Sequence, residues 1–322
     1  MDELPPGGEW RTSGMKRALF LLLAFWPALA QAQLGERIDA ILADPALTRA
    51  SVGVVVARMD PTGPVWLYQK NPTLGLIPAS NQKLLTTAAA IDVLGADFRF
   101  QTMLVRRGDD LVLVGDGDPA LGDAELLKRS GWKTTTLFEQ WAQMLGKRGV
   151  KSVRDVVVDD SVFDDVHTHP SWADKELHAR YAAPVAGINF NINSLDFYVT
   201  LRGDGQAVGY ATDPPTRYAS VRNTCVGGSA NAIWLTRRPG TNEILLAGQA
   251  SANNEAPVSV NIHDPPLYAG TVLAETLEAS GVAVRGRVRV ERGLKAALSG
   301  KSRPAGLEVL AIHATPLATV VA

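Results

Sequence analysis

The chain has 322 residues, of which 46% are hydrophobic, 20% charged and 7% aromatic. This composition supplies ample apolar material for a packed core and excludes a disordered or low-complexity protein. The 32 basic and 33 acidic residues give a net charge of −1, so no basic excess exists to bind nucleic acid by counterion release. The single cysteine, Cys225, excludes an internal disulfide framework and any multi-thiolate metal site. At roughly 150 residues per domain, the length predicts two domains, or one domain with a large insertion.

The first 32 residues have the three parts of a secretory signal peptide. A basic pair precedes a short apolar run over residues 18–26, and small residues at cleavage spacing follow it. The run is shorter than the roughly 20 apolar residues that a membrane-spanning helix needs. Because acidic residues come before the basic pair, we expect residues 1–14 to lie upstream of the true start, Met15. The interpretation is a leader over 1–32 and a soluble periplasmic protein with at most peripheral membrane association; the alternative is a buried N-terminal helix.

Hydrophobic spacing along the rest of the chain predicts a mixed α/β protein. Helices are expected over residues 34–42, 80–94, 137–145 and 267–279, and strands over 51–57, 65–68, 100–107, 111–114, 155–159, 282–290 and 307–313. Short alternating strands separated by turn residues indicate a β-rich segment between residues 195 and 250. Thr315 and Pro316 then form a helix-start signal. Because only six residues follow, we expect that the chain is cut off there.

Ser80 and Lys83 form an S-x-x-K motif at the start of the second predicted helix. At positions i and i+3 the hydroxyl and the ammonium share one helix face. Residues 84–91 are almost free of charge, so we expect a buried helix in which desolvation favours a neutral amine able to take the serine proton. A capping serine and a solvated lysine would give the same spacing, and we interpret a second copy, Ser130 to Lys133, as a surface coincidence.

The segment Pro78–Thr86 resembles the active-site segment of the D-alanyl-D-alanine carboxypeptidase/endopeptidases, the low-molecular-mass class C penicillin-binding proteins. Further segments resemble that family in the same order, and together they cover nearly the whole mature chain. They are Leu113–Pro119, Val157–Phe163, Tyr181–Pro184 with Asn189–Asn191, and Asp264–Gly270 with Gly281–Gly286.

The resemblance implies a transpeptidase domain of the serine β-lactamase/penicillin-binding type, incomplete at its C-terminus. It would comprise residues 33–97 and 259–322, interrupted by an inserted β-rich region over 98–258. Ser80 would attack the carbonyl between two D-alanines of a peptidoglycan stem peptide, with Lys83 as base. No metal or organic cofactor is implied, and β-lactams would acylate Ser80.

The family's site needs two further elements, S-x-N and K-T-G. The nearest matching strings are misplaced: Ser229-Ala230-Asn231, Ser251-Ala252-Asn253 and Lys133-Thr134-Thr135. We therefore expect negligible activity from the 322-residue chain alone, and activity from a version extended through both elements. One alternative is a catalytically dead peptidoglycan-binding or scaffold protein. Another is a serine β-lactamase or esterase, although those enzymes share S-x-x-K without the inserted β-rich domains.

The remaining candidates have ordinary structural interpretations. One loop carries four side chains that could bind a metal: Asp164, Asp165, His167 and His169. We interpret it as a polar loop, because no third anchor is identifiable. Asp116 and Asp118 resemble part of a calcium loop but lack its downstream glutamate, which favours a turn. Cys225 is expected to be a small buried hydrophobe.

Overall fold

The computed structural model describes residues 32–299 and 306–321, so the predicted leader over residues 1–32 lies almost wholly outside the described residues. The chain divides into two compact units, one up to Thr86 and one from Thr87 onward. Within the described residues no helix is long and apolar enough to cross a membrane.

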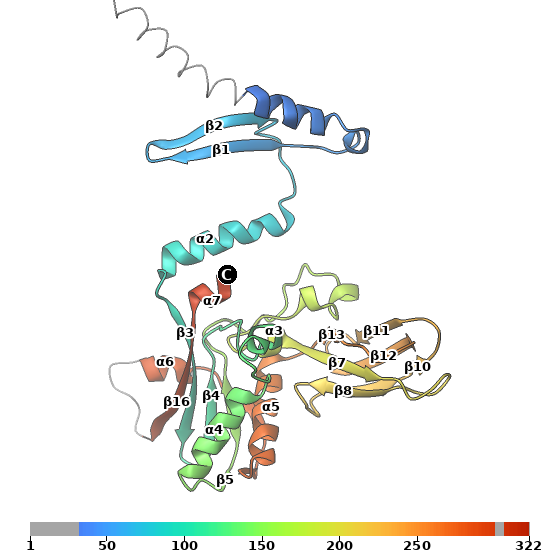
Figure 1. Cartoon of the computed structure of the whole chain (residues 1–322). Coiled ribbons are helices and arrows are strands. Elements are labelled where there is room, and N and C mark those ends of the chain that lie inside the picture. Colours follow the sequence, from blue (N-terminus) through green and yellow to red (C-terminus); the bar gives the residue numbers. More distant parts are fainter. Residues whose placement is uncertain (1–31, 300–305, 322) are drawn as a thin grey trace, which may run out of the picture. The chain divides into compact units, whose positions relative to one another are not determined.

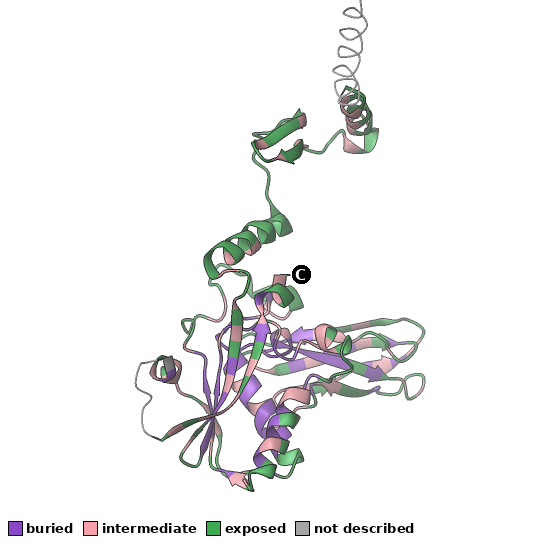
Figure 2. Cartoon of the chain, turned by 60° about the vertical axis from the view of Figure 1, so that its left-hand side comes forward, coloured by how far each residue is buried: buried purple, intermediate pink, exposed green. Residues whose placement is uncertain are grey.

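The first unit is a helix followed by a hairpin. Residues 32–42 are helical, and strands β1 (Val54–Asp60) and β2 (Gly63–Lys70) pair antiparallel, which confirms the helix and the two strands predicted there. The hydroxyl of Tyr68 on β2 donates a hydrogen bond of 2.6 Å to Asp39 on the helix. No residue between 32 and 86 is buried, and the corresponding ribbon in Figure 2 carries no buried colour.

The second unit is built on a five-stranded sheet with the order β15-β6-β4-β3-β16. Three neighbouring strands, β4, β6 and β15, run parallel, and β3 pairs antiparallel with both β4 and β16. The strands are β3 (Arg99–Arg107), β4 (Asp110–Val114), β6 (Val156–Asp159), β15 (Val288–Val290) and β16 (Leu307–Pro316). A short parallel pair joins β5 (Ser152–Val153) to β14 (Ala283–Val284).

Helices cover both faces of this sheet. The two central strands β4 and β6 are buried along their whole length, as parallel strands covered on both faces are. On one face, Leu113 and Val158 share a core with α4 (Thr136–Lys147) and α5 (Pro265–Ala279). On the other face, Val112 packs in a smaller cluster with Leu298 of α6 (Leu294–Ser299). Figure 1 shows α4 and α5 together on one side of the sheet and α6 on the other.

One glycine allows α5 to lie close to the sheet. A Cβ added at Gly270 would stand 2.6 Å from a methyl of Val158 and 2.7 Å from a methyl of Val288. Both distances are shorter than side-chain carbons tolerate, so a larger residue would push the helix off β6 and β15.

The β-rich part of the second unit consists of two small sheets. One has the order β10-β12-β11 with β9 beside β12, and the other has the order β13-β7-β8. Their strands are β7 (Ser194–Thr200), β8 (Gly209–Asp213), β9 (Ser220–Asn223), β10 (Val226–Gly227), β11 (Ala232–Arg237), β12 (Glu243–Ala250) and β13 (Val258–Asn261). This confirms the β-rich character predicted for residues 195–250. Cys225 is fully buried among them, as expected, and that burial raises the pKa of its thiol.

The sheets do not follow the sequence boundaries. The strand predicted over 282–290 is two short strands, β14 and β15, which belong to different sheets, and the strand over 51–57 belongs to a third. The five-stranded sheet joins β3, β4 and β6 to β15 and β16, across the boundary predicted at residue 258. Where β16 ends and β3 begins, the amide of Leu317 donates a hydrogen bond of 2.8 Å to the carbonyl of Phe98. The predicted boundaries differ from the observed sheets because the spacing of hydrophobic residues identifies a strand but not the strand with which it pairs.

Candidate active site

Ser80 lies in the 3-10 turn η2 (Ala79–Asn81), which leads directly into α2 (Gln82–Leu94), so the predicted helix at 80–94 is confirmed. The turn is closed by a 2.9 Å hydrogen bond from the amide of Asn81 to the carbonyl of Pro78. Ala79 has a φ of 46°, a left-handed conformation that costs a residue with a Cβ about 1 kcal/mol or more. Such strain clusters at functional positions, and here it lies immediately before Ser80.

Lys83 lies in the first turn of α2, three residues after Ser80. Both side chains are exposed. Within residues 32–299 and 306–321 the structure assigns neither of them a side-chain hydrogen bond or an ion pair. The hydroxyl and the amine therefore share one end of one helix and are open to solvent and to a substrate.

The expected burial of α2 is wrong in this structure. None of its residues is buried, and Leu84, Leu85 and Val93 are 71%, 66% and 79% exposed. A low charge content shows that a helix has apolar side chains that can be buried. Burial also requires another helix or strand that packs against them. Among the described residues no element supplies this packing, so the desolvation expected around Lys83 is also not present.

The strings that match S-x-N and K-T-G serve local structure in the second unit. The amide of Leu201 donates a 2.8 Å hydrogen bond to Asn253, which ties two loops together. Ser229 and Asn231 are exposed between β10 and β11. Thr135 precedes α4, and its hydroxyl donates a hydrogen bond of 2.8 Å to the carboxylate of Glu139 in the first turn. Each of these strings thus has a local structural role or an exposed position within the second unit.

Three of the segments that carry the family resemblance meet at the carboxyl ends of β4 and β6. The amide of Gly115 donates to the carbonyl of Asp159 at 2.8 Å, and the amide of Gly117 donates to the carbonyl of Gly187 at 2.7 Å. The side-chain amide of Asn189 reaches the carbonyl of Asp118 at 3.4 Å. Segments around residues 115, 159 and 188 are thus one structural group, whereas Ser80 belongs to the other unit.

The segment Asn189–Asn191 continues into a strained turn. Asn191, Ile192 and Asn193 have φ angles of 46°, 53° and 50°, and a left-handed β-branched residue is a clear outlier. Asparagine side chains stabilise the turn. The side-chain amide of Asn193 donates hydrogen bonds of 2.7 Å to the side-chain oxygen of Asn189 and of 2.8 Å to the carbonyl of Pro184. The asparagines are therefore explained by local backbone support.

Several of the acidic and histidine side chains considered as metal ligands have protein partners. His167 contacts Asp160 at 3.0 Å, and Asp160 also accepts from Arg292 at 2.5 Å. His169 contacts Ser171 at 2.7 Å, and Asp116 pairs with Lys295. In the described part of the chain no group of three or more His, Cys, Asp or Glu side chains is arranged to hold a metal ion.

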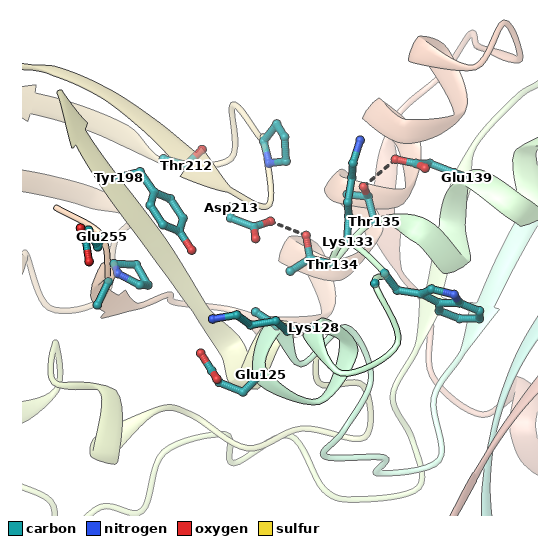
Figure 3. Close-up of a pocket in the computed structure, with 16 residues that line it drawn as sticks. Glu125, Lys128, Lys133, Thr134, Thr135, Glu139, Tyr198, Thr212, Asp213 and Glu255 are labelled. Carbon is teal, nitrogen blue, oxygen red and sulfur yellow. Dashed lines mark hydrogen bonds between the residues drawn. The ribbon is translucent and has the colours of Figure 1, made fainter. Parts of the chain in front are cut away.

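A cavity of about 730 Å³ was not identified from sequence. It lies between α3 (Ala124–Lys128) and the loop before α4 on one side, and β7 and β8 on the other. Figure 3 shows Lys128 and Glu125 pointing toward Tyr198 and Asp213. Burial, and secondarily the nearby Asp196, raises the pKa of Asp213 against the lowering effect of its hydrogen bond from Thr134. The one sequence signal at this cavity is the segment Lys133-Thr134-Thr135, which partly matches the K-T-G string.

Comparison with known proteins identifies relatives along nearly all of the described chain. Residues 34–315 match the model of the D-Ala-D-Ala carboxypeptidase 3 (S13) family. A D-alanyl-D-alanine carboxypeptidase from an Actinomadura species is 36% identical over 293 residues, which are 83% of this chain and 52% of that protein. Carboxypeptidase DacB of Mycolicibacterium smegmatis is 28% identical over 166 residues, 50% of this chain and 35% of that protein. The chain thus spans about half the length of the first of these relatives, and less of the second.

Among solved structures, the chain resembles penicillin binding protein 4 (dacB) from Haemophilus influenzae, with a TM-score of 0.60 and 21% identity over 84% of this chain and 58% of that one. The same protein complexed with a β-lactam gives a TM-score of 0.54 over 84% of this chain and 57% of that one, also at 21% identity. At this identity the likeness establishes the mixed α/β fold.

Proposed function

Because the chain belongs to the D-Ala-D-Ala carboxypeptidase 3 (S13) family, we propose that it acts as a serine-type peptidase on the D-alanyl-D-alanine end of peptidoglycan stem peptides. The observation that carries the proposal is the S-x-x-K pair at the start of α2, inside the matched residues 34–315. The carboxypeptidase name of the Actinomadura relative supports the reaction type.

In the proposed mechanism the Ser80 Oγ attacks the carbonyl carbon of the peptide bond between the two D-alanines. Its proton passes to the Nζ of Lys83, acting as the base, and Lys83 then protonates the leaving D-alanine amine. The remaining peptide is an ester on Ser80, and water hydrolyses that ester to regenerate the hydroxyl. These reaction steps need no metal or organic cofactor. In the same way, Ser80 would open the ring of a β-lactam and form a stable ester with it.

We propose further that the penicillin-binding domain is interrupted after residue 97. The structure favours an interruption longer than the 98–258 expected from sequence, because β16 pairs with β3 over its whole length. The hydrogen bond between Leu317 and Phe98 supports this, because it joins the two points at which the proposed inserted unit would begin and end. On this proposal the transpeptidase domain contains Ser80 and resumes near residue 317.

The proposed location is the periplasm, reached through the leader over residues 1–32. We expect cleavage after Ala30 or Ala32. N-terminal sequencing of exported protein would test this, and a product that still begins at Met1 or Met15 would contradict it.

Fluorescent penicillin tests the catalytic proposal. We expect negligible labelling of the 322-residue chain alone, because groups that hold the substrate carboxylate and relay the proton act as a unit with Ser80 and Lys83. A chain extended through an S-x-N and a K-T-G element should be labelled on the tryptic peptide of residues 71–83, and Ser80→Ala should abolish that label.

The outcomes separate the alternatives. Label on another serine of the extended chain would contradict the role of Ser80. Stoichiometric label on Ser80 of the 322-residue chain would support the nucleophile and overturn the expectation of inactivity. An extended chain that sediments with purified peptidoglycan but takes no label would favour the catalytically dead wall-binding or scaffold protein.

A further inference from the structure

The cavity between α3 and the β7–β8 pair is built entirely within the second unit, so it is a site separate from Ser80. Its volume of about 730 Å³ falls in the range of roughly 300–1,000 Å³ that small-molecule sites occupy. Two aromatic side chains line it while remaining partly open: Trp132 is 40% exposed and Tyr198 is 38% exposed. A cavity with accessible aromatic walls is suited to a ligand larger than an ion.

The charges around the cavity are mixed and mainly acidic. Four carboxylates and two ammonium groups line it: Glu125, Glu139, Asp213, Glu255, Lys128 and Lys133. In the part of the chain that the structure describes, none of the six forms an ion pair. Elsewhere in the second unit charged side chains pair closely, as Arg154 does with Asp110 at 2.8 Å. Unpaired charges of both signs around one cavity remain free to pair with a ligand that carries both signs.

Asp213 is partly buried at the wall of the cavity. One of its carboxylate oxygens accepts a hydrogen bond from the buried hydroxyl of Thr134, which fixes the side chain at the cavity wall. Figure 3 shows Tyr198 directed toward the same space, and Lys128 facing them from α3. Burial raises the pKa of Asp213, and a cation bound beside the carboxylate would act in the opposite direction by favouring its ionised form.

We propose that this cavity binds a short peptide with a free amino end, holding the ammonium at Asp213 and the carboxylate at Lys128. A peptide supplies both signs of charge, whereas a neutral saccharide would leave the carboxylates and lysines without partners. The remaining wall suits small side chains and backbone amides, because it is formed by Ala124, Pro215, Ala256 and Pro257 together with threonine hydroxyls.

The test is titration of the ¹⁵N-labelled protein with tetra-alanine, N-acetyl-tetra-alanine and tetra-alanine amide, followed by NMR. Tetra-alanine should shift resonances of residues 124–135, 198, 212–213 and 255–257. Removing the ammonium by acetylation should weaken binding on the order of tenfold, the effect of one hydrogen bond to a charged group. Asp213→Asn keeps an acceptor for Thr134, and it should cause the same loss for tetra-alanine and little further loss for the acetylated peptide.

A second pair of changes, one in the protein and one in the peptide, tests the carboxyl end of the peptide. Lys128→Ala should weaken tetra-alanine binding and leave tetra-alanine amide unaffected, and Asp204→Asn, an exposed carboxylate outside the cavity, should change nothing. The proposal is overturned if the acetylated peptide binds as tightly as the free one, if Asp213→Asn binds normally, or if the shifts centre on residues 79–94. Loss of Ser80 reactivity with penicillin would leave these binding results unchanged, so the two proposals fail independently.

Discussion

The segment before residue 98 and the sheet unit after it are both rich in apolar residues but reach opposite degrees of burial. Between residues 32 and 97 no side chain is buried, although Ile77, Leu84 and Val93 are among the most exposed large hydrophobic residues. In the sheet unit, β4 and β6 are buried at every position. Figure 2 shows this contrast along the ribbon. The difference teaches that apolar content becomes a core only where a second layer of secondary structure covers it.

The largest expected effect is on amide hydrogen exchange. Amides of β4 and β6 open only when the core unfolds, whereas those of the β1–β2 hairpin lie in a two-stranded sheet without buried side chains. We expect protection factors to differ by a thousandfold or more, as an order of magnitude. Exchange followed by mass spectrometry would measure this, and equal protection of the two regions would break the comparison.

Truncation of matched leucines should show the same contrast in stability. Leu113 on β4 is fully buried, so Leu113→Ala should lower the free energy of unfolding by about 2–5 kcal/mol. Leu85 on α2 is 66% exposed, so Leu85→Ala should change it by less than about 0.5 kcal/mol. Denaturant unfolding measures both. A loss of several kcal/mol in Leu85→Ala would mean that α2 is covered in solution.

Two helical glycines allow a test of packing with the same substitution. Gly270→Ala places a methyl against Val158 and should destabilise the second unit by about 1–3 kcal/mol. Gly146 on α4 has open space around its missing Cβ, so Gly146→Ala should stabilise by about 0.5–1 kcal/mol through helix propensity. Thermal melts of the two variants should move in opposite directions. A stabilised Gly270→Ala protein would show that α5 does not pack tightly on the sheet.

The smallest effect concerns an ion-pair network at the edge of the sheet unit. Hydrogen bonds from Arg107 at 2.5 Å, and then from Arg289 at 2.6 Å, lower the pKa of Glu291 to about 2. A lowered carboxyl pKa contributes stability above the unfolded-state value of about 4.3 and loses it as the pH falls toward 2. Because Glu291 is 38% exposed, we expect Glu291→Gln to cost below about 1 kcal/mol at pH 7 and clearly less as the pH falls through 2.

The control for this prediction is Glu308, which is 61% exposed and 3.6 Å from Arg148. Glu308→Gln should cost less than Glu291→Gln at pH 7, because a long, exposed pair is well screened. Urea unfolding at pH 7, 4 and 2 would follow both variants. A difference between wild type and Glu291→Gln that is unchanged at pH 2 would contradict the electrostatic explanation.

Prediction from sequence was accurate for local elements and poor for burial and pairing. The helices at α2, α4 and α5 and the hairpin of β3 and β4 were all expected within a few residues of their bounds. The helices α3 and α6 were not expected, since segments of five and six residues give too few turns for a hydrophobic period. Ser80 and Lys83 could be singled out from sequence because they are three residues apart at the start of one predicted helix. The cavity residues were missed because they come from segments far apart in the chain.

The family, the mixed α/β character and the spacing of Ser80 and Lys83 could be predicted from the sequence, because each depends on residues that are close along the chain. Which strands share a sheet, and the return of β16 to β3, became visible only in the folded chain. It alone showed that α2 has no cover among the described residues and that Asp213 and Lys128 face one cavity. Pairing, burial and cavities depend on contacts between distant segments, and no local pattern of residues specifies those contacts.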